Sequence, residues 1–418
     1  MGNYIRLFSN GESGREGQED AVLVSICAVC YNHAPYLRQA LNGFLSQKLT
    51  YPDPETKEER HFSIEILIHD DASPDGSADI IREYQERFPD IVKPILQTEN
   101  QYSQGITNIS GAFNFPRAKG KYITLMDCDD YWQSKDKLSL QVAYMEAHPE
   151  CQLCVHAAEV RNDNGDLVDK NLMRPFRKDR DLTIAELIDK AGSFPFGSMM
   201  LRREVVENLP EYYVNCPVGD RPLELMAAER AWRIDVPEHD VLDEAGNIVN
   251  GPEENNGRSA GRSTGRSAGK NAGNNAGGQP GDIAAAHYID RPLSVYRFNG
   301  AGSWTSSMKD DDPEAYREKQ DTYARQMREM YEGFDRATEG IFHKECVSAS
   351  NRLYFLTRVN LRDFKMIFHP RFSRFYKELP ARDKFFIRFE KGLPGVYKRH
   401  RRSGTGESEY HGNNGTGR

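Results

Sequence analysis

The chain has 418 residues, of which 28% are charged and 38% are hydrophobic, and its formal net charge is -8. This length suits about two or three domains with packed cores, and the acidic balance argues against a general nucleic-acid binder, which would usually be basic. The longest apolar run, AVLVSICAVCY, is about half of the roughly 20 residues that a membrane span needs, and MGNYIRLFSNGESGREGQED lacks the apolar region of a signal peptide. These features predict a cytoplasmic protein.

The first third of the chain alternates predicted strands and helices. Four apolar runs indicate strands: VLVSICAVCY, FSIEILIHD, IVKPILQT and KYITLMD. Pro94 weakens the third, short strand or places it at an edge of the sheet. One helix is predicted after Asn32, which we expect to be its N-cap, and another through Ile80, Ile81, Tyr84 and Phe88. This order predicts the α/β class, with a parallel sheet between two layers of helices and ligands beyond the carboxyl ends of its strands.

The remaining elements are predicted from the same patterns. We expect a helix over residues 137–148, a strand in CQLCVHAAEV and a short strand followed by a helix within FPFGSMMLRREVVENLP. Another strand is expected in AAHYIDRPLSVYRF. After Asp312 the pattern becomes helical, with a second helix over about residues 338–360.

Composition predicts the domain organisation. Residues 1–20 and 403–418 are expected to be disordered tails, on either side of an α/β domain over residues 21–310 and a helical, basic and aromatic extension over residues 311–402. Inside the domain, about residues 241–281 repeat Gly, Arg, Ser and Ala. Such a segment buries too little apolar surface to offset its ordering entropy, so we expect a disordered insert.

The basic and aromatic part of the extension, residues 362–402, has two interpretations. It would lie on an anionic membrane surface, which attracts Lys and Arg and accommodates aromatic rings. Alternatively, it forms a helical cap on the catalytic domain, with its charged side chains in solvent. The sequence leaves both open.

Seven cysteines include two pairs with metal-ligand spacing. Two residues separate Cys27 from Cys30 and Cys151 from Cys154, as in a four-cysteine zinc site. Both pairs lie in strand-like runs, where residues three apart point to opposite faces. Buried free thiols in a reducing compartment therefore explain them better than zinc does.

An acidic cluster follows the fourth apolar run, in YITLMDCDDYWQ. Asp127 and Asp129 alternate around Cys128, so their carboxylates project the same way in extended chain. Mg²⁺ and Mn²⁺ prefer such oxygen ligands. The alternative is an ordinary acidic turn in which Asp130 caps a helix.

Polar groups also end the two preceding strands. Asp70 and Asp71 follow the second run, and CYNHAPYL closes the first. Parallel strands end at one edge of a sheet, so these groups should meet the acidic cluster there. The glycine-rich loops that cradle phosphates are missing after the first run.

Three segments in this order, VSICAVCYNHAPYLRQAL, IEILIHDDASPDGSADII and AKGKYITLMDCDDYW, resemble the inverting family 2 glycosyltransferases of the GT-A fold. The resemblance extends over about residues 21–308 without the insert, and DDYWQSKDKLSLQVAYMEAHPE is similar to a bacterial branch with a DxDDYW-type motif. It implies a Rossmann-like, mostly parallel sheet flanked by helices. It also implies transfer of a sugar from a nucleoside-diphosphate sugar, with Mn²⁺ or Mg²⁺, to a glycan or lipid-linked acceptor in surface polysaccharide or glycoconjugate synthesis, in the cytoplasm or at the inner face of the membrane.

The resemblance implies roles for individual residues on the donor side. Tyr31 and Asn32 would lie beside the nucleotide base, and Asp70 or Asp71 would bind the base or ribose. Two further carboxylates would lie at the metal: Asp127, which also contacts the ribose or sugar, and Asp129, which ligates the ion at the diphosphate.

On the acceptor side, Asp220 in NCPVGDRPLEL would be the general base, taking a proton from the acceptor hydroxyl. A helix cap is the alternative for this residue. In LSVYRFNGAGSW, Arg297 would bind the diphosphate and Trp304 would stack on a sugar. Many relatives have a His after this Arg, and Asn299 stands nearby here.

Two other function classes fit these residues less well. A sugar nucleotidyltransferase normally opens with a Gly-rich loop bearing Arg and Lys after its first strand, and CYNHAPYL is not such a loop. A non-catalytic sugar-binding protein would be expected to have lost Asp127, Asp129 or Asp220, and all three are present.

Overall fold

The computed structural model describes residues 22–190, 192–235, 240–242, 248–250, 279–298, 308 and 310–393. The two predicted tails, the repeats of the insert, Trp304 and Asn299 lie outside these residues. Within the insert region, β12 (Asp240–Leu242) and β13 (Ile248–Asn250) pair as a two-stranded sheet.

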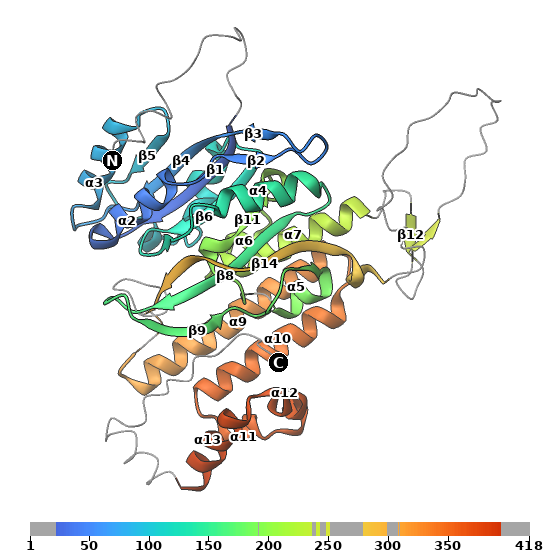
Figure 1. Cartoon of the computed structure of the whole chain (residues 1–418). Helices are drawn as coiled ribbons and strands as arrows, with labels where there is room; N and C mark the ends of the chain where they lie inside the picture. The colour runs from blue at the N-terminus through green and yellow to red at the C-terminus, as the bar shows by residue number, and fades with distance from the viewer. Residues whose placement is uncertain are drawn as a thin grey trace, which may run out of the picture.

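One ten-stranded sheet organises the fold (Figure 1), in the order β10-β14-β8-β11-β6-β1-β4-β5, with β7 on β14 and β9 on β8. Six of its strands, β5, β4, β1, β6, β8 and β14, run in one direction, and the short β11 reverses between β6 and β8. The predicted α/β class with a mostly parallel sheet is therefore confirmed. The strands of this sheet are β1 (Val22–Cys30), β4 (Ser63–Asp70), β5 (Val92–Leu96), β6 (Tyr122–Asp127), β7 (Tyr131–Trp132), β8 (Leu153–Arg161), β9 (Leu167–Met173), β10 (Arg180–Thr183), β11 (Met200–Arg202) and β14 (Ala284–Arg297).

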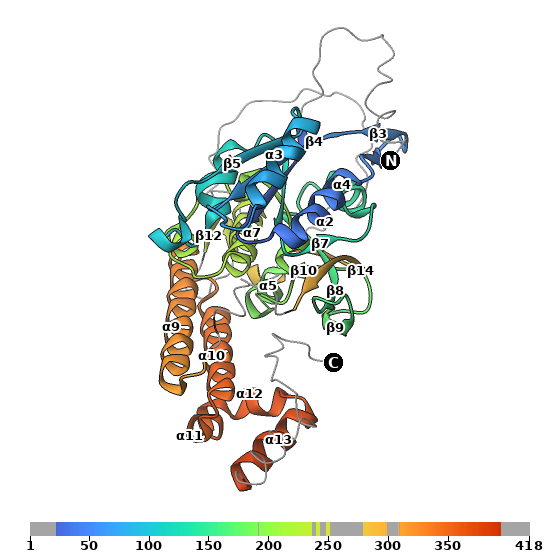
Figure 2. The same ribbon diagram turned by 90° about the vertical axis from the view of Figure 1, so that its left-hand side faces the viewer.

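Helices cover both faces of the sheet (Figures 1 and 2). Alternation along β1 sends Ile26 to one hydrophobic cluster and Cys27 to the other, because successive strand residues point to opposite faces. The first face carries α2 (Ala34–Leu45), α3 (Ser77–Arg87) and α4 (Lys137–Ala147). The second carries α5 (Ile184–Lys190), α6 (Glu211–Val214), α7 (Asp220–Asp235), α9 (Pro313–Ala337) and the first half of α10 (His343–Asn360).

A third, smaller cluster lies beyond the sheet. The end of α10 packs there with α11 (Phe364–Ile367), α12 (Ser373–Glu378) and α13 (Ala381–Gly392). A hairpin of β2 (Thr50–Pro52) and β3 (Glu59–His61) stands apart from the main sheet.

Two local predictions were wrong. Asn32 is not the N-cap of α2: it has φ +60°, a conformation that Asn adopts more readily than most residues, and His33 precedes the first helical turn. The helix expected after β11 is a three-residue 3-10 turn, η5 (Arg203–Val205). The buried residues here, Val205 at the end of the turn and Val206 directly after it, are adjacent in sequence rather than three or four apart, so they form no helical stripe.

All seven cysteines are buried and free. Among the residues that the structure describes, no group of three or more His, Cys, Asp and Glu side chains is arranged to hold a metal ion. Within the same residues, no helix has the length and apolar character needed to cross a membrane.

Lys137, at the start of α4, is fully buried. Its Nζ lies 2.9 Å from Oγ1 of Thr124, 2.8 Å from Oε1 of Gln141 and 4.2 Å from the ring centroid of Trp132. Burial lowers the pKa of Lys137 to about 7, because the charged form loses its hydration. Neutral acceptors and an aromatic ring thus replace water around this amine.

Replacing Lys137 by Met should change how stability varies with pH. The unfolded lysine keeps its ordinary pKa of 10.5, so between about pH 7 and that value the unfolded state binds more protons than the folded state. Relative to Lys137→Met, the stability of the natural protein should therefore rise with pH across this window. Chemical denaturation at several pH values measures the difference. Lys135→Met, at an exposed lysine nearby, should leave the slope unchanged, whereas equal slopes in all three proteins would contradict a neutral buried amine.

Candidate active site

Three parallel strands end together at one edge of the sheet. In register, Cys30 of β1 pairs with Asp70 of β4, and Val29 of β1 pairs with Asp127 of β6. The predicted meeting of the polar strand ends is thus present in the backbone register.

The loop after β4 holds the corner after β1. Ser73 Oγ accepts a hydrogen bond from the backbone N–H of Asn32 at 2.9 Å, and Asp75 Oδ2 accepts one from Ala34 at 2.8 Å. Asp70, itself buried, accepts hydrogen bonds from the N–H and the hydroxyl of Ser73, at 3.2 and 2.5 Å. Asp70 therefore stabilises the loop after β4, and that loop in turn holds the corner after β1.

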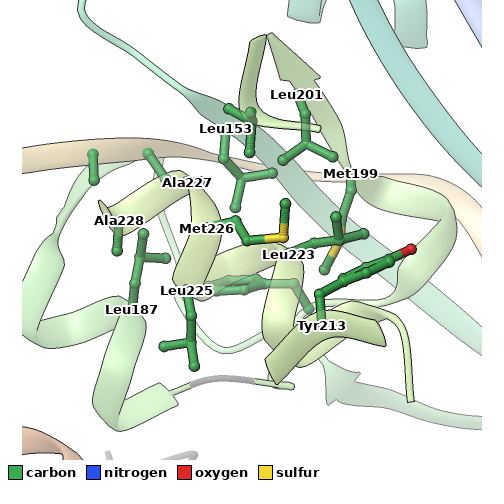
Figure 3. Close-up of a cluster of buried hydrophobic side chains, with 14 of the residues drawn as sticks. Leu153, Leu187, Met199, Leu201, Tyr213, Leu223, Leu225, Met226, Ala227 and Ala228 are labelled. Atoms are coloured by element: carbon green, nitrogen blue, oxygen red, sulfur yellow. The ribbon is translucent and has the colours of Figure 1, made fainter. Parts of the chain in front are cut away.

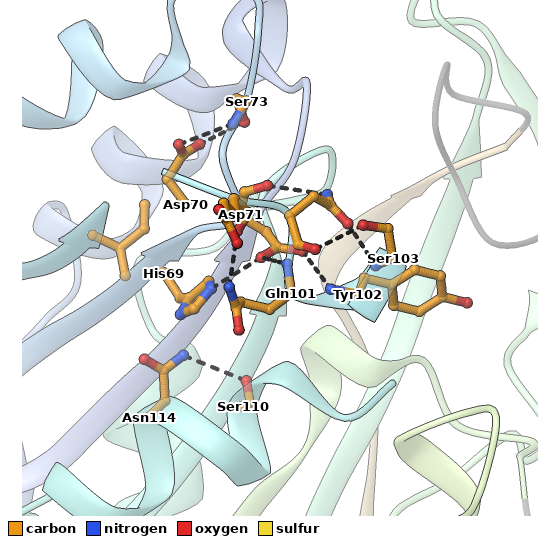
Figure 4. Close-up of polar contacts among 12 residues, drawn as sticks. His69, Asp70, Asp71, Ser73, Gln101, Tyr102, Ser103, Ser110 and Asn114 are labelled. Atoms are coloured by element: carbon orange, nitrogen blue, oxygen red, sulfur yellow. Dashed lines mark hydrogen bonds and ion pairs between the residues drawn. The ribbon is translucent and has the colours of Figure 1, made fainter. Parts of the chain in front are cut away.

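Asp71 holds a second loop from the same strand end (Figure 4). Its carboxylate accepts hydrogen bonds from the backbone N–H groups of Gln101 at 2.7 Å and Tyr102 at 3.0 Å, and His69 Nε2 lies 3.5 Å from Oδ1. The backbone N–H of Asp71 donates to the carbonyl of Cys30 at 2.9 Å, so Asp71 links this loop to the end of β1. The predicted contacts of Asp70 or Asp71 with a base or ribose stay predictions.

Carboxylates from two elements interact at this edge. Asp127 ends β6 with its side chain reaching solvent, and Asp220 is the half-buried first residue of α7. Desolvation by the surrounding protein is the largest cause that raises the pKa of Asp127 above its ordinary value, and the charges of Asp129 and Asp220 raise it further. The structure thus brings together the three acidic residues predicted for metal binding and catalysis.

His33 is a buried residue of this site that the sequence analysis did not single out. Burial lowers its pKa, but the contact with Cys30 and the charges of Asp129 and Asp127 outweigh that effect, so the pKa of His33 is raised. The sequence feature that could have identified His33 is its position in CYNHAPYL, directly after the end of a predicted strand.

Arg297, the last residue of β14, holds the turn after β6 through hydrogen bonds. Its Nε donates to the backbone carbonyl of Asp129 at 2.6 Å, and its backbone N–H donates to Oδ1 of Asp130 at 2.7 Å. Asp130 therefore binds β14 and is not a helix cap; the residue before α4 is Asp136. These hydrogen bonds fix the turn without engaging the carboxylate of Asp129.

The guanidinium of Arg297 is enclosed on its other sides. It donates to Gln39 Oε1 of α2 and lies 4.6 Å from the ring centroid of Tyr36 and 5.0 Å from that of Tyr131. Only 7% of Arg297 is exposed. The predicted contact with a diphosphate stays a prediction, since these neighbours already surround the group.

A hydrophobic core positions Asp220 through α7 (Figure 3). Leu223, Met226 and Ala227 of α7 pack in the cluster that contains Leu153 of β8 and Leu201 of β11. Asp220 is therefore carried by a buried helix rather than by a loop.

Glu224, one turn after Asp220, ties this helix to a neighbouring turn. It is fully buried, and its Oε2 accepts a hydrogen bond from the backbone N–H of Gly192 at 3.0 Å. Gly192 has φ +80°, and a Cβ there would lie 2.6 Å from Nε of Arg221, so only glycine fits. No motif pointed to Glu224, because its role depends on a contact 32 residues away in sequence.

Residues 25–209 match the family model described as Glycosyl transferase family 2. The match covers less than half of the 418 residues. The matched segment contains the ends of β1, β4 and β6, whereas Asp220 and Arg297 lie beyond the matched residues.

Curated relatives and solved structures are similar to parts of the chain. An uncharacterized protein of Mycobacterium tuberculosis (strain H37Rv) is 35% identical over 185 residues, 43% of this chain and 47% of that protein. The Escherichia coli UDP-Glc:alpha-D-GlcNAc-diphosphoundecaprenol beta-1,3-glucosyltransferase WfaP is 35% identical over 126 residues, 30% of this chain and 41% of that protein. The structure of S. aureus TarS 1-349 in complex with UDP-GlcNAc matches with a TM-score of 0.43 and 12% identity, covering 91% of this chain and 92% of that chain. The chain spans about half the length of the curated relatives that it matches.

Replacing Arg297 by Met should destabilise the protein while keeping most of the apolar volume of the side chain. The change removes charge-assisted hydrogen bonds to the Asp129 carbonyl and Gln39, each worth roughly 1.5–3 kcal/mol. We expect unfolding free energy to fall by about 2–4 kcal/mol, measured by urea denaturation. Arg161→Met, at the more exposed end of the neighbouring β8, should cost less than about 1 kcal/mol; equal losses would argue against this role of Arg297.

Proposed function

We propose that this chain is an inverting glycosyltransferase that moves a sugar from a nucleoside-diphosphate sugar to an acceptor hydroxyl, with Mn²⁺ or Mg²⁺, in surface polysaccharide or glycoconjugate synthesis. The family 2 match supports the reaction class. The observation that carries the proposal is the interaction of Asp127, Asp129 and Asp220 at the carboxyl edge of the sheet. Ligands of open α/β sheets bind at that edge.

The acidic pair fits a divalent metal ion. Asp127 and Asp129 supply carboxylate oxygens. Desolvation and then the charge of Asp129 raise the pKa of Asp127, and a cation would relieve the repulsion between the two carboxylates. The described residues offer no complete metal cage, which agrees with an ion held by one or two carboxylates and the phosphates of the donor. When bound, the ion would neutralise charge growing on the leaving diphosphate.

The donor nucleoside would lie between the loops that Asp70 and Asp71 hold in place. Tyr31 is 41% exposed and Tyr102 is 49% exposed. The backbone N–H of Tyr102 donates to Asp71, and Tyr31 follows Cys30, whose carbonyl accepts a hydrogen bond from the N–H of Asp71. Exposed aromatic rings offer a surface for a planar base. Asn32, whose backbone N–H is bound to Ser73, would present its side chain beside them.

Asp220 would act as the general base. Its place at the start of a rigid helix, within electrostatic range of Asp127, puts it on the edge where the donor would lie. From there it would take the proton of the acceptor hydroxyl as the oxygen attacks the anomeric carbon. Attack opposite to the leaving diphosphate inverts the configuration in one displacement, without a covalent sugar intermediate.

Arg297 would position the metal-side turn instead of binding phosphate directly. Its guanidinium is buried against two tyrosines and the Asp129 carbonyl. A cation held there would keep the Asp127–Asp129 turn rigid when a metal and donor bind. Positioning of the turn fits the observed partners of Arg297 better than the direct diphosphate contact that the family resemblance implies.

The acceptor is proposed as a glycan or a lipid-linked sugar. The E. coli relative is named as a glucosyltransferase for alpha-D-GlcNAc-diphosphoundecaprenol. That relative supports a lipid-linked sugar as the chemical class of the acceptor for this chain.

Asp129→Ala should abolish metal-dependent turnover while the protein stays folded. Loss of a ligand to the ion should lower kcat by on the order of a hundredfold or more, measured as nucleoside diphosphate released from a panel of nucleotide sugars with Mn²⁺ or Mg²⁺. Asp136→Ala removes an exposed carboxylate seven positions along the chain and should leave turnover unchanged. Full activity in the Asp129 variant would overturn the metal assignment.

Asp220→Asn should separate binding from transfer. The amide keeps the shape of the side chain but cannot accept a proton, so transfer should fall by on the order of a hundredfold or more. Donor affinity, measured by calorimetry with a non-transferable analogue, should change little. Asp235→Asn, at the exposed other end of α7, is the matched control. Retained transfer in the Asp220 variant would reject it as the base.

A further inference from the structure

The C-terminal module, residues 361–393, carries a charge opposite to that of the whole chain. It contains nine Lys and Arg residues and four Asp and Glu residues, in a chain whose net charge is -8. Figures 1 and 2 both place the module at the end of the molecule opposite β5, where the α/β body does not cover it. A local positive charge of this kind favours an anionic partner.

The aromatic residues of the module divide into two groups. Phe372 and Phe375 are buried with Ile367 and the end of α10 in the third cluster. In contrast, Phe385 of α13 is 63% exposed, and Leu393, directly after the helix, is 52% exposed. Core packing therefore explains the first group and leaves the second without an explanation.

The geometry of α13 separates an inner from an outer face. Ile387 is the buried residue of the helix and anchors it to the third cluster. Phe385 and Phe389 each lie two residues from Ile387, or about 200° around the helix, so they point to the opposite side. Their rings stack with centroids 6.0 Å apart and an interplanar angle of 10°. We call the side with Phe385, Phe389 and Leu393 the outer face of α13.

Cations border this outer face. Arg382, one turn before Phe385, is exposed and lies 5.8 Å from the ring centroid of Phe386. Arg388, one position before Phe389, is also exposed, and its Nε donates to the hydroxyl of Tyr376 at 3.0 Å. Lys391 lies about 40° around the helix from Ile387, over the ring of Phe368, and so belongs to the inner face. An aromatic stripe bordered by cations is typical of a helix that lies in the plane of a membrane interface.

We propose that the outer face of α13 binds the surface of a lipid bilayer containing anionic headgroups, with its aromatic side chains at the acyl boundary and its cations on the lipid phosphates. The helix has 12 residues, too few to cross the bilayer. A second copy of the chain fits less well, because two modules of the same positive charge would repel each other. This inference rests on the surface alone and does not require the proposed transfer reaction.

The test is cosedimentation of the full chain with vesicles of phosphatidylcholine alone or mixed with phosphatidylglycerol. Binding is expected with the anionic vesicles and should weaken as salt is raised, because salt screens the cations. Phe385→Ala combined with Leu393→Ala should weaken binding on the order of tenfold, as apolar contact is lost. Arg382→Glu combined with Arg388→Glu should also weaken it on the order of tenfold or more.

Two controls use exposed residues on α10, outside the module. Val347→Ala matches the apolar change and Lys344→Glu matches the charge change, and neither should affect binding. Thermal unfolding checks that each variant folds, and turnover measured with a soluble acceptor separates membrane binding from activity.

The proposal would be overturned by absent binding, by equal binding to neutral and anionic vesicles, or by equal losses in control and outer-face variants. It would also be overturned if the natural chain ignored vesicles but formed a dimer in analytical ultracentrifugation that Phe385→Ala dissociated. That result would assign the face to a second copy of the chain.

Discussion

Repulsion among the carboxylates of Asp127, Asp129 and Asp220 is the constraint on which the site depends. Desolvation by the surrounding protein, and then the like charges of Asp129 and Asp220, raise the pKa of Asp127. A chain would relax such a cluster if its parts could move apart. Here the register of β1, β4 and β6 fixes one side, and the buried face of α7 fixes the other. The core therefore maintains an arrangement that the charges themselves oppose.

Arg297 helps to hold this arrangement without neutralising the negative charge of the carboxylates. The guanidinium binds the main-chain carbonyl of Asp129, and the peptide N–H of Arg297 binds Asp130. A salt bridge to Asp127 or Asp129 would instead have consumed the negative charge that a metal ion needs. The cation thus stabilises the shape of the turn, and the carboxylates at its tip stay available to a ligand.

The main strands and their ends were predictable from sequence for a simple reason. Strands buried on both faces read as continuous apolar runs, and parallel strands place their carboxyl ends at one edge. The partners of Arg297 and Glu224 were not predictable, because each depends on a contact far along the chain. The α2 cap was missed for a related reason. Hydrogen bonds from the loop after β4, through Ser73 and Asp75, set the corner that residue propensity alone would place at Asn32.

The C-terminal extension shows how one composition serves two purposes. Met327 and Phe334 of α9 share a core with α7, so these helices support the element that carries Asp220. Farther along, the same mixture of Phe, Arg and Lys forms a small cluster on one side of α13 and an exposed stripe on the other. Sequence composition does not separate the two, because only the phase of the helix around Ile387 decides which rings are buried. Covering the surface of Phe385 and Leu393 that is still exposed, 63% and 52% of the two residues, would contribute about 1–2 kcal/mol each. A bilayer with anionic headgroups would cover both while pairing with the neighbouring cations.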